Sequence, residues 1–328
     1  MPMVDPFTPD AFSLNTLTLA INNLKYQPKR LGQLGLFEED GITTLDAAIE
    51  ERDGVLDLVD VAARGSTGST IADEARRIRT FRVPHLPQRD AVLADEVQGK
   101  REFGTENSAE VLQNRVNRKL QLMRRNLDYT TESHRVLSVK GSFMDANGVQ
   151  RSLFTEFGVS QQSQAMGFSD TASNKAREKA LLVLEKIESA LDGVDYSGVR
   201  VLCGSEFWKA LIENKDDKDT YKNTQMASAL RADPRLEFES HGFMWERYRG
   251  TSLVKIPDGE AYAIPMGVEG LFVTRFAPAD YNETVNTRGL PYYAKGEPMK
   301  FGKGWEMEAQ SNQINLCTRP AAIIKLTV

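Results

Sequence analysis

The run Phe276-Ala-Pro-Ala-Asp-Tyr-Asn-Glu-Thr-Val-Asn-Thr287 decides the fold of this 328-residue chain, together with Gln310-Ser-Asn-Gln-Ile-Asn-Leu-Cys-Thr-Arg-Pro320. Neither stretch has the spacing of a catalytic motif. Asn282-Glu-Thr284 matches a glycosylation sequon, but that pattern matters only in a secreted chain. No catalytic motif elsewhere in the sequence is as specific as these two stretches, so the interpretation starts from them.

Both stretches resemble the major capsid proteins of lambda-type tailed phages, the capsid protein E family. Other short segments resemble the same family, in one order, from about residue 12 to about residue 326. Gln310-Ser311 is followed by Asn-Gln, where relatives commonly have a proline-containing stretch. The other matching segments are Leu31-Gly-Gln-Leu-Gly-Leu-Phe37, Gly41-Ile-Thr-Thr44, Val83-Pro-His85, Asp95-Glu-Val-Gln-Gly99, Arg101-Glu-Phe-Gly104, Lys140-Gly141, Asp145-Ala-Asn-Gly148 and Glu156-Phe-Gly158.

The resemblance implies an α+β chain with the Hong Kong 97-type capsid fold. Its expected parts are an N-terminal arm (1–47), an extended loop (48–98), a peripheral domain with a long spine helix (99–165 and 271–310) and an axial domain (166–270 and 311–328). The implied function is self-assembly into hexamers and pentamers of an icosahedral virion shell around double-stranded DNA, built in the host cytoplasm. The implied partners are other copies, a portal, a scaffold and a decoration protein, with weak, non-specific contact to the DNA. No catalytic residue, cofactor, metal or membrane partner is expected.

Composition fits these expectations. The chain has 41 basic and 46 acidic residues, a net charge of -5, which opposes avid binding to a polyanion. Hydrophobic residues make up 41% of the chain, enough to bury real cores. No window approaches 18 consecutive apolar residues, and Met1-Pro-Met-Val-Asp-Pro-Phe7 lacks a basic region followed by an apolar one, so we expect a soluble protein that stays where it is made. Cys203 and Cys317 lack Cys-x-x-Cys spacing, and buried free thiols are favoured over a disulfide.

The N-terminal region predicts one short helix within an extended arm. Apolar residues recur at steps of three and four between Ser13 and Leu24. An arm without its own core must pack on another surface, although a mobile tail is the alternative. The candidate arm contacts are Leu17, Ile21, Leu24 and Phe37.

Strand-like alternation in residues 43–64 and 78–83 predicts a long two-stranded ribbon. Isolated ribbons are marginally stable, so this one is expected to lie against another surface. The ribbon tip is not a phosphate-binding loop, because no lysine precedes its Ser/Thr. The tip residues, which we expect at a subunit interface, are Arg64, Gly65, Ser66, Thr67, Gly68, Ser69 and Thr70.

The clearest helix is predicted over Thr105–Glu132, with an apolar stripe that includes Leu120 and Leu127. Its basic residues predict a solvated face, with contact to scaffold, DNA or an acidic neighbour as the alternative. Alternation over residues 136–159 predicts a hairpin turning at Asp145-Ala-Asn-Gly148. A second helix is expected to end at Leu191.

Residues that could carry chemistry have stronger structural interpretations. His85, His134 and His241 lack metal-ligand spacing, Asp216-Asp-Lys-Asp219 lacks the EF-hand pattern, and Ser205 fits a helix N-cap better than a nucleophile. Aromatic residues Phe243, Trp245 and Tyr248 could stack on single-stranded nucleic acid, but packing is favoured. An encapsulin-like compartment shell, or a soluble enzyme, remains as an alternative function.

Overall fold

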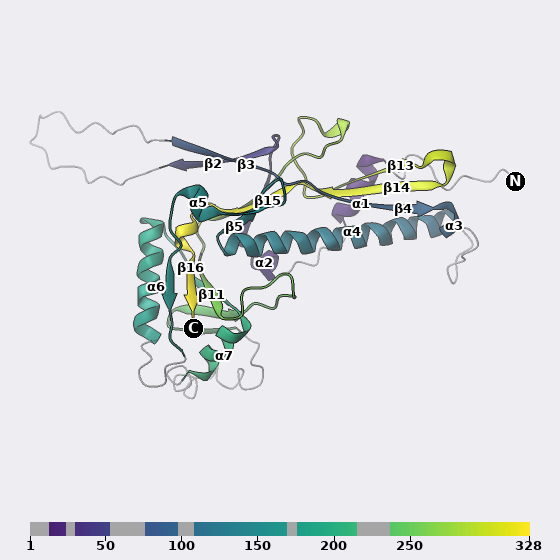
Figure 1. Cartoon of the computed structure of the whole chain (residues 1–328). Helices are drawn as coiled ribbons and strands as arrows, with labels where there is room; N and C mark the ends of the chain where they lie inside the picture. The colour runs from purple at the N-terminus through teal and green to yellow at the C-terminus, as the bar shows by residue number, and fades with distance from the viewer. Residues whose placement is uncertain (1–12, 24–29, 53–75, 98–107, 169–175, 215–236) are drawn as a thin grey trace, which may run out of the picture.

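A computed structural model describes residues 13–23, 30–52, 76–97, 108–168, 176–214 and 237–328. The described chain forms an elongated upper body along one long helix and a lower lobe that holds the C-terminus (Figure 1). In Figure 1, a two-stranded ribbon extends away from the body on the side opposite α3 (Ala94–Val97). The arrangement is a mixed α+β fold.

The upper body is a sheet laid along the long helix α4 (Ser108–Val139). Its strands run in the order β13 (Tyr293–Pro298), β14 (Gly304–Ser311) and β4 (Leu86–Leu93), and α3 (Ala94–Val97) joins β4 to the helix end. At 1.5 Å per residue, α4 spans about 48 Å. The apolar faces meet in one core cluster whose members include Leu17, Ile21, Val92, Val116, Leu120, Met123, Leu127, Tyr292, Ala294, Trp305, Met307 and Ala309.

The lower lobe contains a six-stranded sheet with helices α6 (Ala176–Leu191) and α7 (Ser205–Glu213). The second helix expected from the sequence is α6, which ends at Leu191 as predicted and buries Ala180, Ile187 and Leu191. Phe243 and Trp245 are fully buried in the same core, beside Phe207. In order, the strands are β7 (Ser163–Ala165), β16 (Ile324–Thr327), β11 (Glu260–Met266), β8 (Gly198–Cys203), β10 (Phe243–Arg247) and β9 (Phe238–Ser240).

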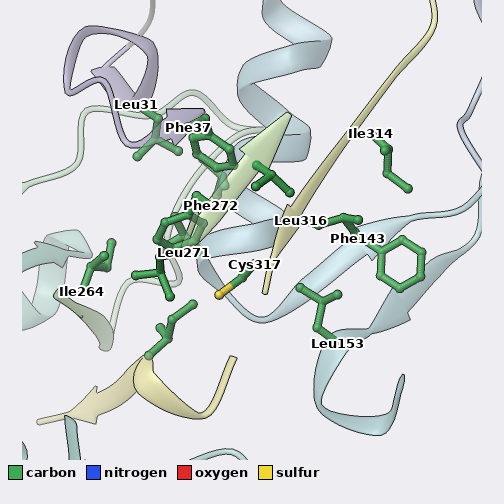
Figure 2. Packing of buried hydrophobic residues seen from close by; sticks show 14 of the residues in the cluster. Leu31, Phe37, Phe143, Leu153, Ile264, Leu271, Phe272, Ile314, Leu316 and Cys317 are labelled. Atoms are coloured by element: carbon green, nitrogen blue, oxygen red, sulfur yellow. The ribbon is translucent and has the colours of Figure 1, made fainter. Parts of the chain in front are cut away.

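A third core joins the two parts (Figure 2). It includes the sheet of β1 (Phe37–Gly41), β12 (Phe272–Phe276) and β15 (Gln313–Cys317), in which β1 runs parallel to β12. The small hairpin of β5 (Ser142–Met144) and β6 (Gln150–Ser152), followed by α5 (Leu153–Phe157), packs on it. Short 3-10 turns occur at η2 (Asn282–Thr284), η3 (Lys300–Gly302) and η4 (Pro320–Ala322).

The N-terminal region forms α1 (Leu14–Asn23) and α2 (Arg30–Gln33), so the short helix predicted there is confirmed. The ribbon consists of antiparallel β2 (Asp46–Arg52) and β3 (Arg76–Arg82), with Asp46 opposite Arg82 and Arg52 opposite Arg76. Across the described ranges, none of the helices combines the length and apolar character that a membrane crossing requires.

Two sequence predictions in the middle of the chain are wrong. The segment 136–139 is the last turn of α4 and not a strand, because Val136 and Val139 share the buried face and Gly141, at φ 75°, follows the helix end. The residues after β6 form α5, which ends at Gly158 in the left-handed conformation. The turn at Asp145-Ala-Asn-Gly148 is confirmed, and the Asp145 carboxylate accepts hydrogen bonds from the amides of Asn147 and Val149, both 2.9 Å.

Candidate assembly surfaces

The ribbon is anchored to the body by one aromatic side chain at its root. Phe81 is 5% exposed and packs edge-on against Phe143, with ring centres 5.2 Å apart, and against Phe157 at 6.1 Å. On the same face of β3, Arg79 donates hydrogen bonds to the carbonyls of Glu156 and Phe157 and stacks over the Phe157 ring. The root is therefore fixed to the end of α5.

The opposite face of the ribbon is open to solvent. Ile78, on the face away from Phe81, is 60% exposed, and the Asp46–Arg82 ion pair at 3.3 Å is also exposed. The predicted tip, Arg64 to Thr70, lies outside the described residues and stays a prediction. Such a ribbon exposes apolar surface that its own subunit does not cover.

The arm helix α1 packs on the edge of the upper sheet. Leu17 and Ile21 are buried in the core of the same chain. The Thr18 hydroxyl accepts a hydrogen bond from the Ala294 amide (3.1 Å) and donates one to the Ala294 carbonyl (3.2 Å). Because β13 is an edge strand, these bonds satisfy backbone groups that would otherwise lack strand partners.

Further polar contacts fix α1 at its C-terminal end. The Asn22 amide donates to the Tyr292 carbonyl at 2.9 Å. Arg124, buried on α4, donates to the Ile21 and Asn22 carbonyls and lies over the Tyr292 ring. Cationic hydrogen bonding at a helix C-terminus stabilises the helix. Residues 14–23 are therefore packed and hydrogen-bonded as part of the fold of their own subunit.

A second anchor ties α2 to the lower lobe. Arg30 forms hydrogen bonds with Glu246 (2.9 Å) and Glu237 (3.1 Å), and Arg200 bonds to both of these carboxylates at 2.6 Å. The hydrogen bond from Arg200 is the main reason that the pKa of Glu237 is lowered. Alternating charges of this kind hold α2 to strands β8 and β10 of the lower lobe.

Glu132 on α4 connects three elements. Its Oε1 accepts hydrogen bonds from the Leu31 amide (3.0 Å) and from the Tyr248 hydroxyl (2.9 Å). Burial, together with Glu132, raises the pKa of Tyr248, so its hydroxyl remains a donor.

The candidate arm contact Phe37 is buried beside Phe272, with ring centres 5.1 Å apart. Of the candidate arm contacts, Leu17, Ile21 and Phe37 therefore pack within their own chain, and Leu24 lies outside the described residues.

A buried polar segment carries the chain from the upper sheet to the junction. Gln310, Ser311, Asn312 and Gln313 are all at most 5% exposed, and β14 and β15 meet at this point. Their side chains are satisfied by hydrogen bonds to groups of the surrounding loops and of α4: Gln310 to Asp280, Ser311 to the Pro291 carbonyl, Asn312 to the Pro278 carbonyl and to His85, and Gln313 to Thr131. A satisfied network of this kind favours one arrangement of the chain.

The solvated face predicted for the basic residues of α4 is present only in part: Arg118 and Arg125 are exposed, and the other three basic residues of the predicted face have partners within the chain. Lys119 donates to the Ala91 carbonyl and lies 3.3 Å from the carboxylates of Asp90 and Glu96. Arg115 lies 3.8 Å from Glu96, and Arg124 holds α1 as described above. These charges are used mainly to fasten β4, α3 and α1 to the helix. Their partners lie far away in sequence, and periodicity alone cannot reveal them.

The polar residues considered as possible catalytic or metal-binding groups have surroundings that fit a structural role. His134 is buried in α4, and burial lowers its pKa to about 4. Cys203 and Cys317 are buried free thiols, as predicted, and burial raises the pKa of Cys317 to about 12. Within the described ranges, no three His, Cys, Asp or Glu side chains group as a metal site would require. The run Asp216–Asp219 lies outside those ranges.

Ser205 is not the N-cap that the sequence predicted, because Gly204 occupies that position. The Asp258 carbonyl accepts the amides of Glu206 and Phe207, and a Cβ on Gly204 would lie only 2.0 Å from the Pro257 carbonyl oxygen. The Ser205 hydroxyl instead donates to the Asp258 carboxylate at 2.7 Å, which is the main reason that the pKa of Asp258 is lowered. The strand-to-helix turn is thus closed by a neighbouring loop, with no nucleophile exposed.

A long helix along one sheet, a second sheet at one end and a rooted, projecting ribbon together form a fold that is found in solved capsid subunits. The same fold occurs in a crystal structure of an E. coli CFT073 prophage protein described as a capsid protein, with a TM-score of 0.61, 12% identity and coverage of 96% of this chain and 99% of that one. It also occurs in the capsid of Myoviridae phage XM1, with a TM-score of 0.50, 11% identity and 93% coverage of each chain. The expected fold class is confirmed.

The chain belongs to the family described as phage major capsid protein E, which matches residues 13–328. The major capsid protein of Pseudomonas phage KPP10 is 29% identical over 317 residues, covering 89% of this chain and 90% of that protein. The resemblance identified from the sequence is confirmed. The chain is a structural protein of the virion, and its copies form the capsid shell of a tailed phage.

Proposed function

We propose that copies of this chain form hexamers and pentamers that close an icosahedral head around double-stranded DNA, and that the β2–β3 ribbon extends across a neighbouring copy. One observation carries the second part: Ile78 is 60% exposed on a ribbon whose other face is rooted through Phe81. A two-stranded ribbon is marginally stable by itself, so a second surface is needed beyond the root. Heterologous contacts that rotate and close build rings of subunits.

The expected division into four parts is retained in this proposal. Residues 1–47 act as the arm, 48–98 as the extended loop, 99–165 with 271–310 as the peripheral domain and 166–270 with 311–328 as the axial domain. The separate core clusters around α4 and around Trp245 support the last two. The division assigns β12 to the peripheral domain and β15 to the axial domain, although the two strands pair in one sheet.

The proposal also covers the other partners. A portal, a scaffold and a decoration protein contact the shell, which assembles in the host cytoplasm. The packaged DNA is contacted weakly and non-specifically, which a net charge of -5 supports. The protein acts as no enzyme, since the polar groups that could have carried chemistry are used in packing and hydrogen bonding.

The experiment compares two ribbon variants with the wild type in purified form. Ile78→Ser should leave the melting temperature of the dissociated subunit within about 2 °C, because an exposed position contributes little to folding. Deletion of Ser66–Ser69 should leave it equally unchanged, because we propose that the tip contacts a neighbouring copy and not its own core. Both should reduce shell formation, measured by light scattering and electron microscopy. Wild-type protein that stays monomeric at high concentration, with and without a scaffold, would count against the whole proposal. Ribbon variants that assemble like the wild type would count against the ribbon contact alone.

A further inference from the structure

The hairpin between β13 and β14 ends in a four-residue loop, Lys300-Phe301-Gly302-Lys303. A hydrogen bond from the Met299 amide to the Gly304 carbonyl (2.9 Å) closes this loop. Phe301 is 93% exposed, more than any other large hydrophobic side chain in the part of the chain that the structure describes. The loop lies at the end of the upper body farthest from the lower lobe (Figure 1).

The backbone at Phe301 adopts a conformation that is unusual for phenylalanine. Its φ of 64° and ψ of 18° lie in the left-handed region, which glycine and asparagine adopt readily and aromatic residues rarely do. Folding of the subunit would therefore be served better by glycine here, since the ring makes little contact within its own chain. Strained backbone holding an exposed aromatic ring is typical of a position used for contact outside the subunit.

The two lysines give the loop a positive charge. Lys300 and Lys303 are exposed, and no carboxylate in the described residues pairs with either. The ring of Phe301 is thus presented between two cationic side chains. A fitting surface would combine some apolar area with an excess of carboxylates.

The outer face of the same sheet has that chemistry. An open pocket of about 330 Å³ is lined by Arg89, Asp280, Tyr281, Lys295, Glu297, Glu306 and Glu308. Its four carboxylates exceed its two cations, and Glu297 lies directly opposite Glu306 in the strand register. Like charges directly opposite each other destabilise a strand pair. Arg89 pairs with Glu308, and Lys295 with Glu283, so cations from elsewhere would relieve the repulsion at Glu297 and Glu306.

We propose that the loop 300–303 of one copy docks on the outer sheet face of a second copy. Lys300 and Lys303 pair with Glu297 and Glu306 of that copy, and Phe301 packs against the Tyr281 ring at the pocket. The loop points past the end of its own sheet, so the contact joins two different surfaces and repeats from copy to copy. This inference rests on the proposed self-assembly and names a surface that carries it.

Phe301→Gly provides the first test, made on the full-length chain. Because glycine accepts this backbone conformation, the dissociated subunit should melt at a higher temperature than the wild type. The protein concentration needed for shell formation should nevertheless rise at least about tenfold, as for loss of an aromatic hot spot. Phe301→Tyr should assemble like the wild type. If Phe301 served only to stabilise its own subunit, Phe301→Gly would change the melting temperature and the ability to form shells in the same direction.

Charge reversal tests the partner surface. Glu297→Lys with Glu306→Lys should block shell formation, and so should Lys300→Glu with Lys303→Glu. Combining all four substitutions in one chain should restore assembly, because every copy then carries both the reversed loop and the reversed face. Failure of this combined variant to assemble overturns the pairing, and assembly of Phe301→Gly at the wild-type concentration overturns the docking role of the loop. If wild-type protein forms no shells at all, the proposed function itself fails.

Discussion

Replacing Thr18 by valine should detach α1 from the edge strand that it covers. Valine keeps the approximate shape of threonine but removes the hydroxyl that both accepts from the Ala294 amide and donates to the Ala294 carbonyl. Ala294 is fully buried, so neither group gains water in exchange. An unsatisfied buried polar group costs about 1–3 kcal/mol, so the free energy of unfolding should fall by about 2–4 kcal/mol. That is a large part of the 5–15 kcal/mol typical of a folded domain.

Urea unfolding of the dissociated subunit, followed by circular dichroism, would measure the loss. Hydrogen exchange adds a local readout, because the Ala294 amide should lose protection in Thr18→Val and keep it in Thr18→Ser. Thr16→Val is the matched control: Thr16 is exposed on the same helix, and its hydroxyl accepts a hydrogen bond from the Ser13 hydroxyl and bonds to no other group in the described part of the chain, so its cost should stay within about 0.5 kcal/mol. Equal costs for the valine substitutions at Thr18 and Thr16 would refute the reasoning.

Two further outcomes concern buried groups of α4. Tyr248→Phe should destabilise the subunit by about 1–2 kcal/mol in the wild-type background and by much less in Glu132→Leu, which has no acceptor for the Tyr248 hydroxyl; additive losses in a double-mutant cycle would contradict the contact. Burial lowers the pKa of His134 from its usual 6.5 to about 4, so the unfolded chain binds a proton that the folded chain does not, and stability should fall by up to about 3 kcal/mol as the pH drops from 6.5 towards 4. Unfolding measured across that range should show a shallower pH dependence in His134→Gln, and an unchanged slope would show that another group is responsible.

Local patterns predicted the elements whose signals lie within a few residues. The apolar stripe through Leu120 and Leu127 predicted most of α4, and the turn at Asp145-Ala-Asn-Gly148 fixed the hairpin, with Gly148 at φ 73°. The same reasoning misplaced the end of α4, because Leu137 and Val139 fit the two-residue alternation of a strand, whereas Val136 and Val139 fit the three-residue step of a helix. Tertiary burial of Val136 and Val139 decides for the helix.

Contacts between distant parts of the chain could not be predicted in this way. Thr18 meets Ala294, and Glu132 meets both Leu31 and Tyr248, and nothing in the local sequence pairs these residues. One signal was present in the sequence but was not used. Polar residues follow the helical step on the inner side of α4, where they are now seen buried, and such residues require partners: Asp128, Thr131, Glu132, Arg135 and Ser138.

The buried polar segment at Gln310–Gln313 joins β14 to β15, and this continuity affects how the subunit carries mechanical load. Strands β14, β15 and β16 follow one another along residues 304–327, so a single length of backbone passes through each of the larger sheets in turn. Tension between the far hairpin and the lower lobe would run lengthwise along these strands, and many ladder hydrogen bonds would have to shear together before any could yield. A shell built from such subunits resists stretching within each subunit, so its deformation takes place at the contacts between subunits.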